Sequence, residues 1–422
     1  MLKKIYKYIV IIIITIIFAI AFTGSHSVQS VDDLAYTVAL GIDIGEKENL
    51  KVTFQFTMPS ASSESGSGEA APPVIDTVEA NSIDTAINLM NAYVSKEINL
   101  SHCKIIVISE DFAKNGISKE IYSLMNKVQI RPDSNVIIST STAKEYIENV
   151  SPSLENLVAK FYEVLPRSSE YTGYSIKAQL GDFFNQLVCQ TCEPTAILGN
   201  IVKDKEEDSK ASNGSNNSEK SGSSGSTSGN SSSSGQQSEA KSAKNGIENL
   251  GVAVFKDDKL IGQLSPEETL VHLLLRNELK SCNISVLDPE NENDKIDLFL
   301  NLNHTSKIKV NIVNGTPYIK VDITANAKIS SIDNISQKMT EERLKKVEQS
   351  AKTYMKKLLS DYLYKTSKEF RSDIVGLGKY CLSEFKTNTE FEEYNWLNRY
   401  QDAFFDVNAQ INIKSGFLLI GT

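Results

Sequence analysis

The sequence of 422 residues holds only one long apolar run, which excludes a membrane protein with several spans. Basic residues are outnumbered, with 44 lysines and arginines against 53 aspartates and glutamates, and the net charge is -9. Because so acidic a chain is a poor general ligand for phosphate backbones, nucleic acid is not an expected partner. Apolar patterns recur along the rest of the chain, which excludes a protein that is disordered throughout.

Cysteine is also scarce. Five cysteines are too few for a disulfide scaffold, and their odd number leaves at least one thiol free or in an intermolecular bond. Cys189 and Cys192 form a C-x-x-C motif, but no second pair completes a zinc site, so a local disulfide or two idle thiols are expected. Cys103 and Cys282 stand in apolar runs, where cysteine packs as a small hydrophobe.

Catalytic motifs are missing as well. The sequence contains no G-x-S-x-G, H-E-x-x-H or P-loop. Glu268 and His272 lie four residues apart on an expected helix, which is too few ligands for a metal, so a surface pair is expected. Asp373 is expected in a turn whose glycines supply positive φ, and Asp43 in a hairpin turn. We therefore expect neither catalytic nor metal-binding residues. The chain is expected not to be an enzyme and to bind no cofactor.

The single apolar run covers residues 8–22 and follows three lysines. As a helix it would measure about 22 Å, between a signal-peptide core and a full membrane span. We expect residues 1–24 to form a signal-like membrane anchor with the N-terminus in the cytoplasm and the remaining chain outside. A small-x-small site at residues 19–21 leaves cleavage open. The expected anchor residues are Tyr8, Ile11, Ile14, Ile17 and Phe22.

The rest of the chain divides into three parts by composition. Residues 25–200 alternate strand-like and helical patterns and predict an N-terminal α/β region. Residues 203–247 consist mainly of Ser, Gly, Asn, Lys and Glu and predict a disordered linker. Residues 248–422 predict a C-terminal α+β region. The fold class expected is α+β, with two to three mixed α/β modules, antiparallel or mixed sheets, and one long helix in the C-terminal half.

Local signals are clearest in the C-terminal region. Ser265-Pro266-Glu267-Glu268 is typical of a capped helix start. Asn314-Gly315 between alternating strands predicts a tight hairpin. The long helix is expected from apolar residues at helical spacing between Leu344 and Tyr362. Trp396 stands among other aromatic residues, where core packing is expected and a contact patch is the alternative.

Four segments, in order along the chain, carry a resemblance to a known family: residues 33–43 with 51–55, 251–262 with 267–269, 372–378, and 405–413 with Gly416. They are similar to segments of the Ger(x)C family of spore germination proteins, the C subunit of nutrient germinant receptors in endospore-forming bacteria. The family-motif residues are Gly41, Asp43, Gly251, Phe255, Gly262, Asp373, Gly376 and Gly378.

The resemblance implies a non-enzymatic, membrane-anchored subunit that dormant spores need in order to respond to nutrients. Its implied partners are a large membrane subunit, a transporter-like subunit and the membrane itself, and its implied place is the extracytoplasmic side of the spore inner membrane. Whether the chain binds the germinant directly is left open. An extracytoplasmic solute-binding protein and an exported hydrolase are the alternatives.

One departure from the family concerns lipidation. Family members usually carry a lipidated cysteine, and a count back from Gly41 without gaps places that position on Ser25. A serine hydroxyl cannot take the thioether-linked diacylglycerol, so the lipidation position is lost in this chain. The apolar run is then the expected means of attachment.

Overall fold

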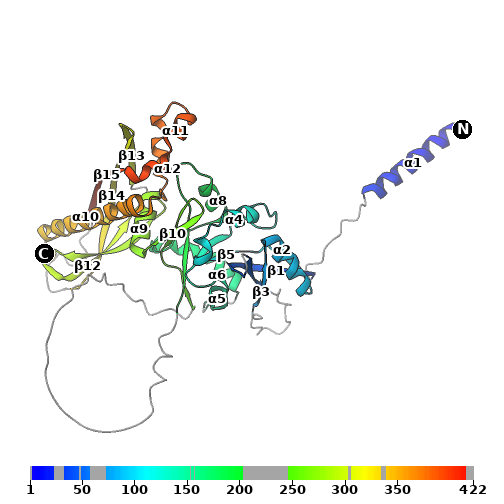
Figure 1. Cartoon of the computed structure of the whole chain (residues 1–422), viewed down its shortest axis with the longest axis horizontal. Helices are drawn as coiled ribbons and strands as arrows, with labels where there is room; N and C mark the ends of the chain where they lie inside the picture. The colour runs from blue at the N-terminus through cyan, green and yellow to red at the C-terminus, as the bar shows by residue number, and fades with distance from the viewer. Residues whose placement is uncertain are drawn as a thin grey trace, which may run out of the picture.

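A computed structural model describes residues 2–22, 33–46, 49–57, 73–152, 154–155, 157–202, 246–302, 306–333 and 339–414. Ser25 and nearly all of the expected linker at 203–247 lie outside the described residues. Helix α1 (Leu2–Phe22) lies apart from the rest of the molecule in Figure 1. Among the described residues, no helix has both the length and the apolar character that a membrane span needs. The mixed α/β architecture is confirmed, and the described residues form two sheets.

The first sheet has the strand order β10-β9-β7-β6-β5-β1-β2-β3, with β4 beside β1 and β8 beside β7. Its four central strands, β7, β6, β5 and β1, run parallel, and antiparallel hairpins extend it on both sides. The strands are β1 (Leu34–Ile44), β2 (Leu50–Thr57), β3 (Val74–Ala80), β4 (Glu97–Asn99), β5 (Ile105–Ser109), β6 (Asn135–Ser139), β7 (Thr195–Ile201), β8 (Ile247–Glu248), β9 (Val252–Lys256) and β10 (Lys259–Leu264).

Both faces of this sheet are covered, so β5 and β6 are buried along their whole length and read as continuous apolar runs. Ile106 and Ile108 share a core with α2, α4 and α8, while Ile105 and Val107 face α5 and α6. The helices between these strands are α2 (Ile83–Tyr93), α3 (Glu110–Ala113), α4 (Ser118–Met125), α5 (Ala143–Glu148), α6 (Val158–Val164), η2 (Leu165–Ser168), α7 (Ser169–Thr172) and α8 (Leu180–Leu187).

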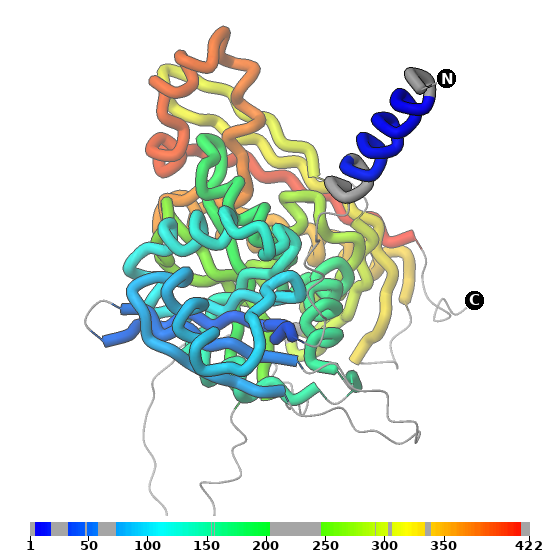
Figure 2. The backbone as a smooth tube through the Cα atoms, turned by 90° about the vertical axis from the view of Figure 1, so that its right-hand side faces the viewer, coloured from blue at the N-terminus to red at the C-terminus, as the bar shows by residue number. Residues whose placement is uncertain are grey.

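The second sheet has the order β11-β12-β14-β13, with β15 parallel to β14 on its other side. Its strands are β11 (Ser281–Asp288), β12 (Asn291–Asn301), β13 (Ser306–Val313), β14 (Thr316–Ile332) and β15 (Phe404–Ile413). Asn314 and Gly315 close the β13–β14 hairpin with φ of 51° and 81°, the conformation that this pair favours. In Figure 2 this yellow hairpin projects at one end of the body and the blue first strands lie at the other.

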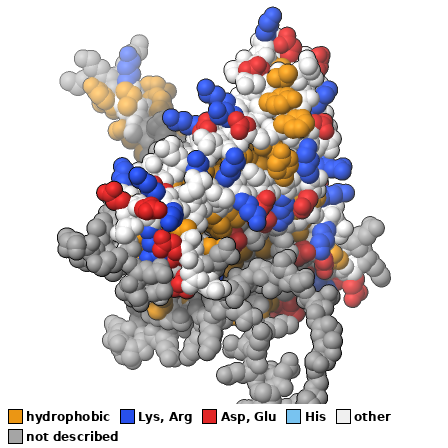
Figure 3. Space-filling model, turned by 90° about the vertical axis from the view of Figure 1, so that its left-hand side faces the viewer, with side chains coloured by type: hydrophobic (Ala, Val, Ile, Leu, Met, Phe, Trp, Pro, Cys, Tyr) orange, Lys and Arg blue, Asp and Glu red, His pale blue; other side chains and the backbone are white. Residues whose placement is uncertain are grey.

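Alternation along β14 buries every second side chain, and helices α9 (Pro266–Arg276) and α10 (Glu341–Tyr364) share the core below it. Val347, Ala351, Met355 and Leu359 form the buried stripe of α10, and lysines occupy its exposed side. Figure 3 shows lysine and arginine side chains interspersed with acidic ones on one side of the molecule, with hydrophobic side chains exposed between them.

After α10 the chain continues through η3 (Lys365–Phe370), η4 (Leu377–Glu384), α11 (Asn388–Tyr394), α12 (Trp396–Arg399) and η5 (Tyr400–Asp402) before it enters β15. Trp396 is 1% exposed, so it packs in the core.

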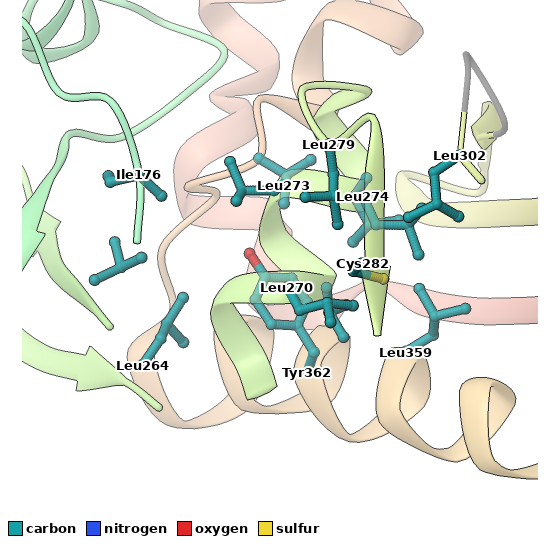
Figure 4. Close-up of a cluster of buried hydrophobic side chains, with 14 of the residues drawn as sticks. Ile176, Leu264, Leu270, Leu273, Leu274, Leu279, Cys282, Leu302, Leu359 and Tyr362 are labelled. Atoms are coloured by element: carbon teal, nitrogen blue, oxygen red, sulfur yellow. The ribbon is translucent and has the colours of Figure 1, made fainter. Parts of the chain in front are cut away.

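Hairpin β9–β10 lies in the expected C-terminal region, yet it completes the first sheet by pairing with β7. The core continues across it: Figure 4 shows Leu264 of β10, Leu270 of α9 and Tyr362 of α10 in one cluster of buried side chains. The two sheets therefore share apolar packing, and the region boundaries at 200 and 248 stay a prediction.

Candidate functional site

Asp373 is a family-motif residue whose side chain accepts four hydrogen bonds. One carboxylate oxygen accepts the backbone N–H groups of Gly376 and Leu377 at 2.9 and 3.0 Å. The other accepts the N–H of Gly378 at 2.9 Å and the indole N–H of Trp396 at 2.8 Å. Burial of this fully enclosed side chain raises its pKa to about 6, although each of the four donors acts to lower it.

The spacing D-x-x-G-x-G explains how one carboxylate reaches three successive backbone donors. Gly376 has φ of 78°, a left-handed conformation that turns the chain back over Asp373. Gly378 lies directly beneath the indole, and a Cβ built on it would lie 2.6 Å from Cδ1 of Trp396. We call residues 372–378 the Asp373 loop. Its glycines permit the turn and the close approach that the four bonds require.

The Asp373 loop joins two other segments. The Ser372 hydroxyl donates to the Phe255 carbonyl of β9 at 2.6 Å, and the Asp373 carbonyl accepts the Glu193 N–H at 2.9 Å. The Glu193 carboxylate in turn accepts the Asp257 N–H in the β9–β10 turn at 2.8 Å. A junction of three segments results, made by the loop before β7, the β9–β10 hairpin and the Asp373 loop.

Two further motif glycines support the same hairpin. Gly251 has φ of 97° and donates its N–H to the Tyr174 carbonyl at 2.8 Å. Gly262 lies against the Phe370 ring, where a Cβ would approach Cε1 to 2.6 Å. Four of the eight motif residues, Phe255, Asp373, Gly376 and Gly378, therefore lie at the junction, and Gly251 and Gly262 lie along the hairpin that it holds.

Glu193 was missed by reasoning from sequence. It is 3% exposed, and burial raises its pKa to about 7. No local pattern marks it, because its bond to Asp257 joins positions 64 residues apart.

Gly41 and Asp43 lie elsewhere, in β1, and the prediction that Asp43 is a turn residue is wrong. Asp43 is buried, and its carboxylate accepts the N–H groups of Ala143 and Lys144 at 2.7 and 3.0 Å at the start of α5. Gly45 and Asn49 make the hairpin turn instead, through an N–H···O bond of 2.8 Å. The sequence pattern showed the turn but not the helix that β1 faces.

The prediction that Glu268 and His272 form a surface pair is also wrong. His272 is 1% exposed, and its Nδ1 lies 2.8 Å from the Tyr362 hydroxyl. Burial lowers the pKa of His272 well below its usual value, so the ring is neutral. Glu268 instead pairs with Lys365 at 2.8 Å. The reason is that α9 is enclosed along almost its whole length, so residues on all its sides are buried.

A cavity of about 110 Å³ lies beside His272. It is lined by Lys177, Asp182, Gln186, Arg276 and Glu278 together with apolar residues. Arg276 already pairs with Glu278 at 2.7 Å. The volume falls below the several hundred Å³ that is usual for a site enclosing a small-molecule ligand.

The chemistry of the Asp373 junction is structural. All four donors already bond to its carboxylate, and the carboxylate is fully enclosed, so it is placed to hold a loop and not to exchange protons with a substrate. Within the described part of the chain, no group of three or more His, Cys, Asp or Glu side chains could hold a metal ion.

Two family models and two curated relatives match the chain. Residues 27–203 match the family model "Spore germination protein N-terminal domain", and residues 250–416 match "Spore germination B3/ GerAC like, C-terminal". Spore germination protein KC of Bacillus subtilis (strain 168) is 21% identical over 410 residues, which cover 95% of this chain and 94% of that protein. Putative spore germination protein YfkR of the same organism is 21% identical over 427 residues, which cover 100% of this chain and 99% of that protein.

The fold also has a solved counterpart. The crystal structure of the GerBC protein superposes with a TM-score of 0.50 and 13% sequence identity, covering 92% of this chain and 100% of that one. Both family models match in the expected order and together cover most of the chain. The chain belongs to the Ger(x)C family of spore germination proteins.

Proposed function

We propose that this chain is a non-enzymatic, membrane-anchored subunit of a spore germinant receptor complex that dormant spores need in order to respond to nutrients. The observation that carries the proposal is the match of both halves of the chain to spore germination families. The Asp373 junction supports it, because its buried carboxylate holds three segments together and offers no reacting group to a substrate. Its partners are a large membrane subunit and a transporter-like subunit.

Helix α1 is the proposed anchor, and it holds the rest of the chain on the extracytoplasmic side of the spore inner membrane. Its isoleucines are exposed, for example Ile11 at 58%, Ile14 at 59% and Ile17 at 61%. Transfer of each such side chain from water into hydrocarbon stabilises the inserted helix by about 1.5–3 kcal/mol. The apolar part measures about 22 Å against about 30 Å of hydrocarbon, so local thinning of the bilayer or cover from partner subunits must accommodate it.

The receptor role is tested on spores that lack this chain. They should respond slowly or not at all to nutrients and normally to a trigger that bypasses nutrient detection, and the wild-type chain should restore the response. Affinity purification of a tagged chain from spore membranes should recover the two partner subunits. An unchanged nutrient response, or purification with a small solute and without membrane subunits, would contradict the proposal.

The anchor is tested with a matched pair of chains, wild type and Ser25→Cys. The wild-type chain should remain in the membrane fraction at high salt, keep residues 1–24 and incorporate no labelled fatty acid. The variant restores a thiol at the family's lipidation position and should gain the label. Fatty acid on the wild-type chain, or a mature chain that begins after Ala21, would contradict the proposed anchor.

A further inference from the structure

The C-x-x-C motif lies against the Asp373 loop. Cys189 and Cys192 are free thiols that are partly exposed, whereas Cys103, Cys282 and Cys381 are buried. The Thr191 N–H donates to the Cys189 sulfur at 3.4 Å, and the Thr191 hydroxyl lies 3.1 Å from the same sulfur. On the other side, Cys192 packs over Gly376, whose built Cβ would lie 3.3 Å from the Cys192 Cβ.

The two thiols differ in character because they are hydrogen-bonded to each other. The bond from the Cys192 thiol, together with those from Thr191, lowers the pKa of Cys189 to about 5. The same contact and burial raise the pKa of Cys192, with Asp373 raising it further and Arg276 lowering it. The pair is therefore a thiolate next to a protonated thiol at neutral pH.

The remaining cysteines provide the contrast within one chain. Burial raises the pKa of Cys103, Cys282 and Cys381 to about 12. Because the thiolate is the reactive form, thiol chemistry should be confined to the C-x-x-C motif.

We propose that Cys189 and Cys192 form a site of reversible disulfide exchange, in which Cys189 attacks a low-molecular-weight disulfide and Cys192 completes an internal disulfide. The geometry carries this assignment: two partly exposed free thiols lie three residues apart in one short segment, and the Thr191 N–H and hydroxyl contact the attacking sulfur.

The exchange proceeds in two balanced steps. The Cys189 thiolate attacks one sulfur of the small disulfide, whose S–S bond breaks, and one small thiolate leaves and takes up a proton. Cys192 then gives its proton to solvent, and its sulfur attacks the Cys189 sulfur of the mixed disulfide. The second small thiolate leaves and is protonated. The protein loses two electrons, and the small disulfide gains them as two thiols.

The site adjoins the junction that the motif residues form. Glu193 follows Cys192 directly, and its N–H is bonded to the Asp373 carbonyl while its carboxylate holds Asp257. Oxidation therefore constrains the segment that links the β9–β10 hairpin to the Asp373 loop. This inference goes beyond the proposed receptor role and does not depend on it.

Oxidised glutathione is the probe for the first experiment, applied to the folded full-length chain. Trypsin releases residues 178–203 with both cysteines, and each of the other three cysteines falls in a separate peptide. The 178–203 peptide should become lighter by two hydrogen atoms, and dithiothreitol should reverse the change. Cys192→Ser should accumulate one glutathione on Cys189, whereas Cys189→Ser should accumulate none. Glutathione on both variants alike, or an unmodified wild-type peptide, would overturn the proposal.

A second measurement needs no variant. Alkylation by iodoacetamide at pH 6 is followed at Cys189 in the folded chain and in the same chain unfolded in guanidinium chloride. The lowered pKa increases the fraction of Cys189 that is thiolate and decreases the intrinsic nucleophilicity of that thiolate. The net result should be alkylation of Cys189 that is roughly tenfold faster in the folded chain than in the unfolded chain. Equal or slower alkylation in the folded chain would overturn the assignment of Cys189 as the attacking sulfur.

Discussion

Replacement of Gly378 by alanine should destabilise the Asp373 loop through a steric clash and not through backbone strain. The φ of Gly378 lies outside the left-handed region, so alanine suffers no backbone strain. Its Cβ would approach Cδ1 and Nε1 of Trp396 to 2.6 and 2.7 Å, and the Cα of Thr191 to 2.9 Å. Overpacking of this kind costs about 1–3 kcal/mol. Displacement of the indole also weakens its bond to the Asp373 carboxylate, a bond to a charged group worth about 1.5–3 kcal/mol.

The expected loss of unfolding free energy is therefore about 2.5–6 kcal/mol when the indole bond is lost completely. Urea unfolding of the full chain in mild detergent measures it, with circular dichroism as the signal because Trp396 is the only tryptophan. Gly315→Ala is the matched control. Its nearest non-neighbouring atom would lie 3.7 Å away, so only the cost of a left-handed alanine, about 1 kcal/mol, should appear.

A double-mutant cycle with Trp396→Ala tests the cause. If the indole is the obstacle, Gly378→Ala should cost at least about 1 kcal/mol less in the Trp396→Ala background. Additive effects of the two substitutions, within about 0.5 kcal/mol, would refute the steric argument.

Three further substitutions follow from the buried charges. Because the pKa of Asp373 rises from 3.8 to about 6 on folding, its contribution is present below about pH 4 and is lost as pH rises through 6. The stability of the wild type relative to Asp373→Asn should thus fall by about 3 kcal/mol between pH 3.5 and 7, as urea titrations at each pH will measure. Asp43→Ala leaves two donors of α5 without their acceptor and should cost about 2 kcal/mol, with Glu46→Ala as an exposed control. Arg343→Leu leaves the enclosed Asp288 carboxylate without its guanidinium and should cost about 3–5 kcal/mol, a loss that Arg343→Leu combined with Asp288→Leu should reduce.

Local chemistry was predictable from sequence where the signal and the structure lie within a few residues. Ser265 and Glu268 form the capping box that their spacing indicates, with bonds of 3.2 and 2.8 Å. Asn314 and Gly315 close their hairpin for the same reason, since each adopts the φ that the turn requires. The long helix also follows from its own apolar spacing.

Long-range placement was not predictable in the same way. Periodicity shows that β9 and β10 form a hairpin but not that β9 pairs with β7, because a strand pattern records burial and not the partner. His272 occupies a helix position that looks polar, yet α9 is enclosed by elements distant from it in sequence, among them α10. The bond between Glu193 and Asp257 depends on the same tertiary arrangement.

Four motif residues of this chain, Gly41, Asp43, Asp373 and Gly378, share a physical task, which is to hold segments of the chain together. Asp43 and Asp373 are both buried carboxylates that bind backbone N–H groups, the first at the start of α5 and the second within its own loop. Next to each lies a glycine whose missing side chain allows close packing: Gly41 beside Ile147 and Gly378 beneath Trp396. Such positions determine how segments meet, so substitutions there should act on the folding of the chain and the assembly of a complex. Under the proposed receptor role, loss of nutrient response in these variants should accordingly track their loss of unfolding free energy.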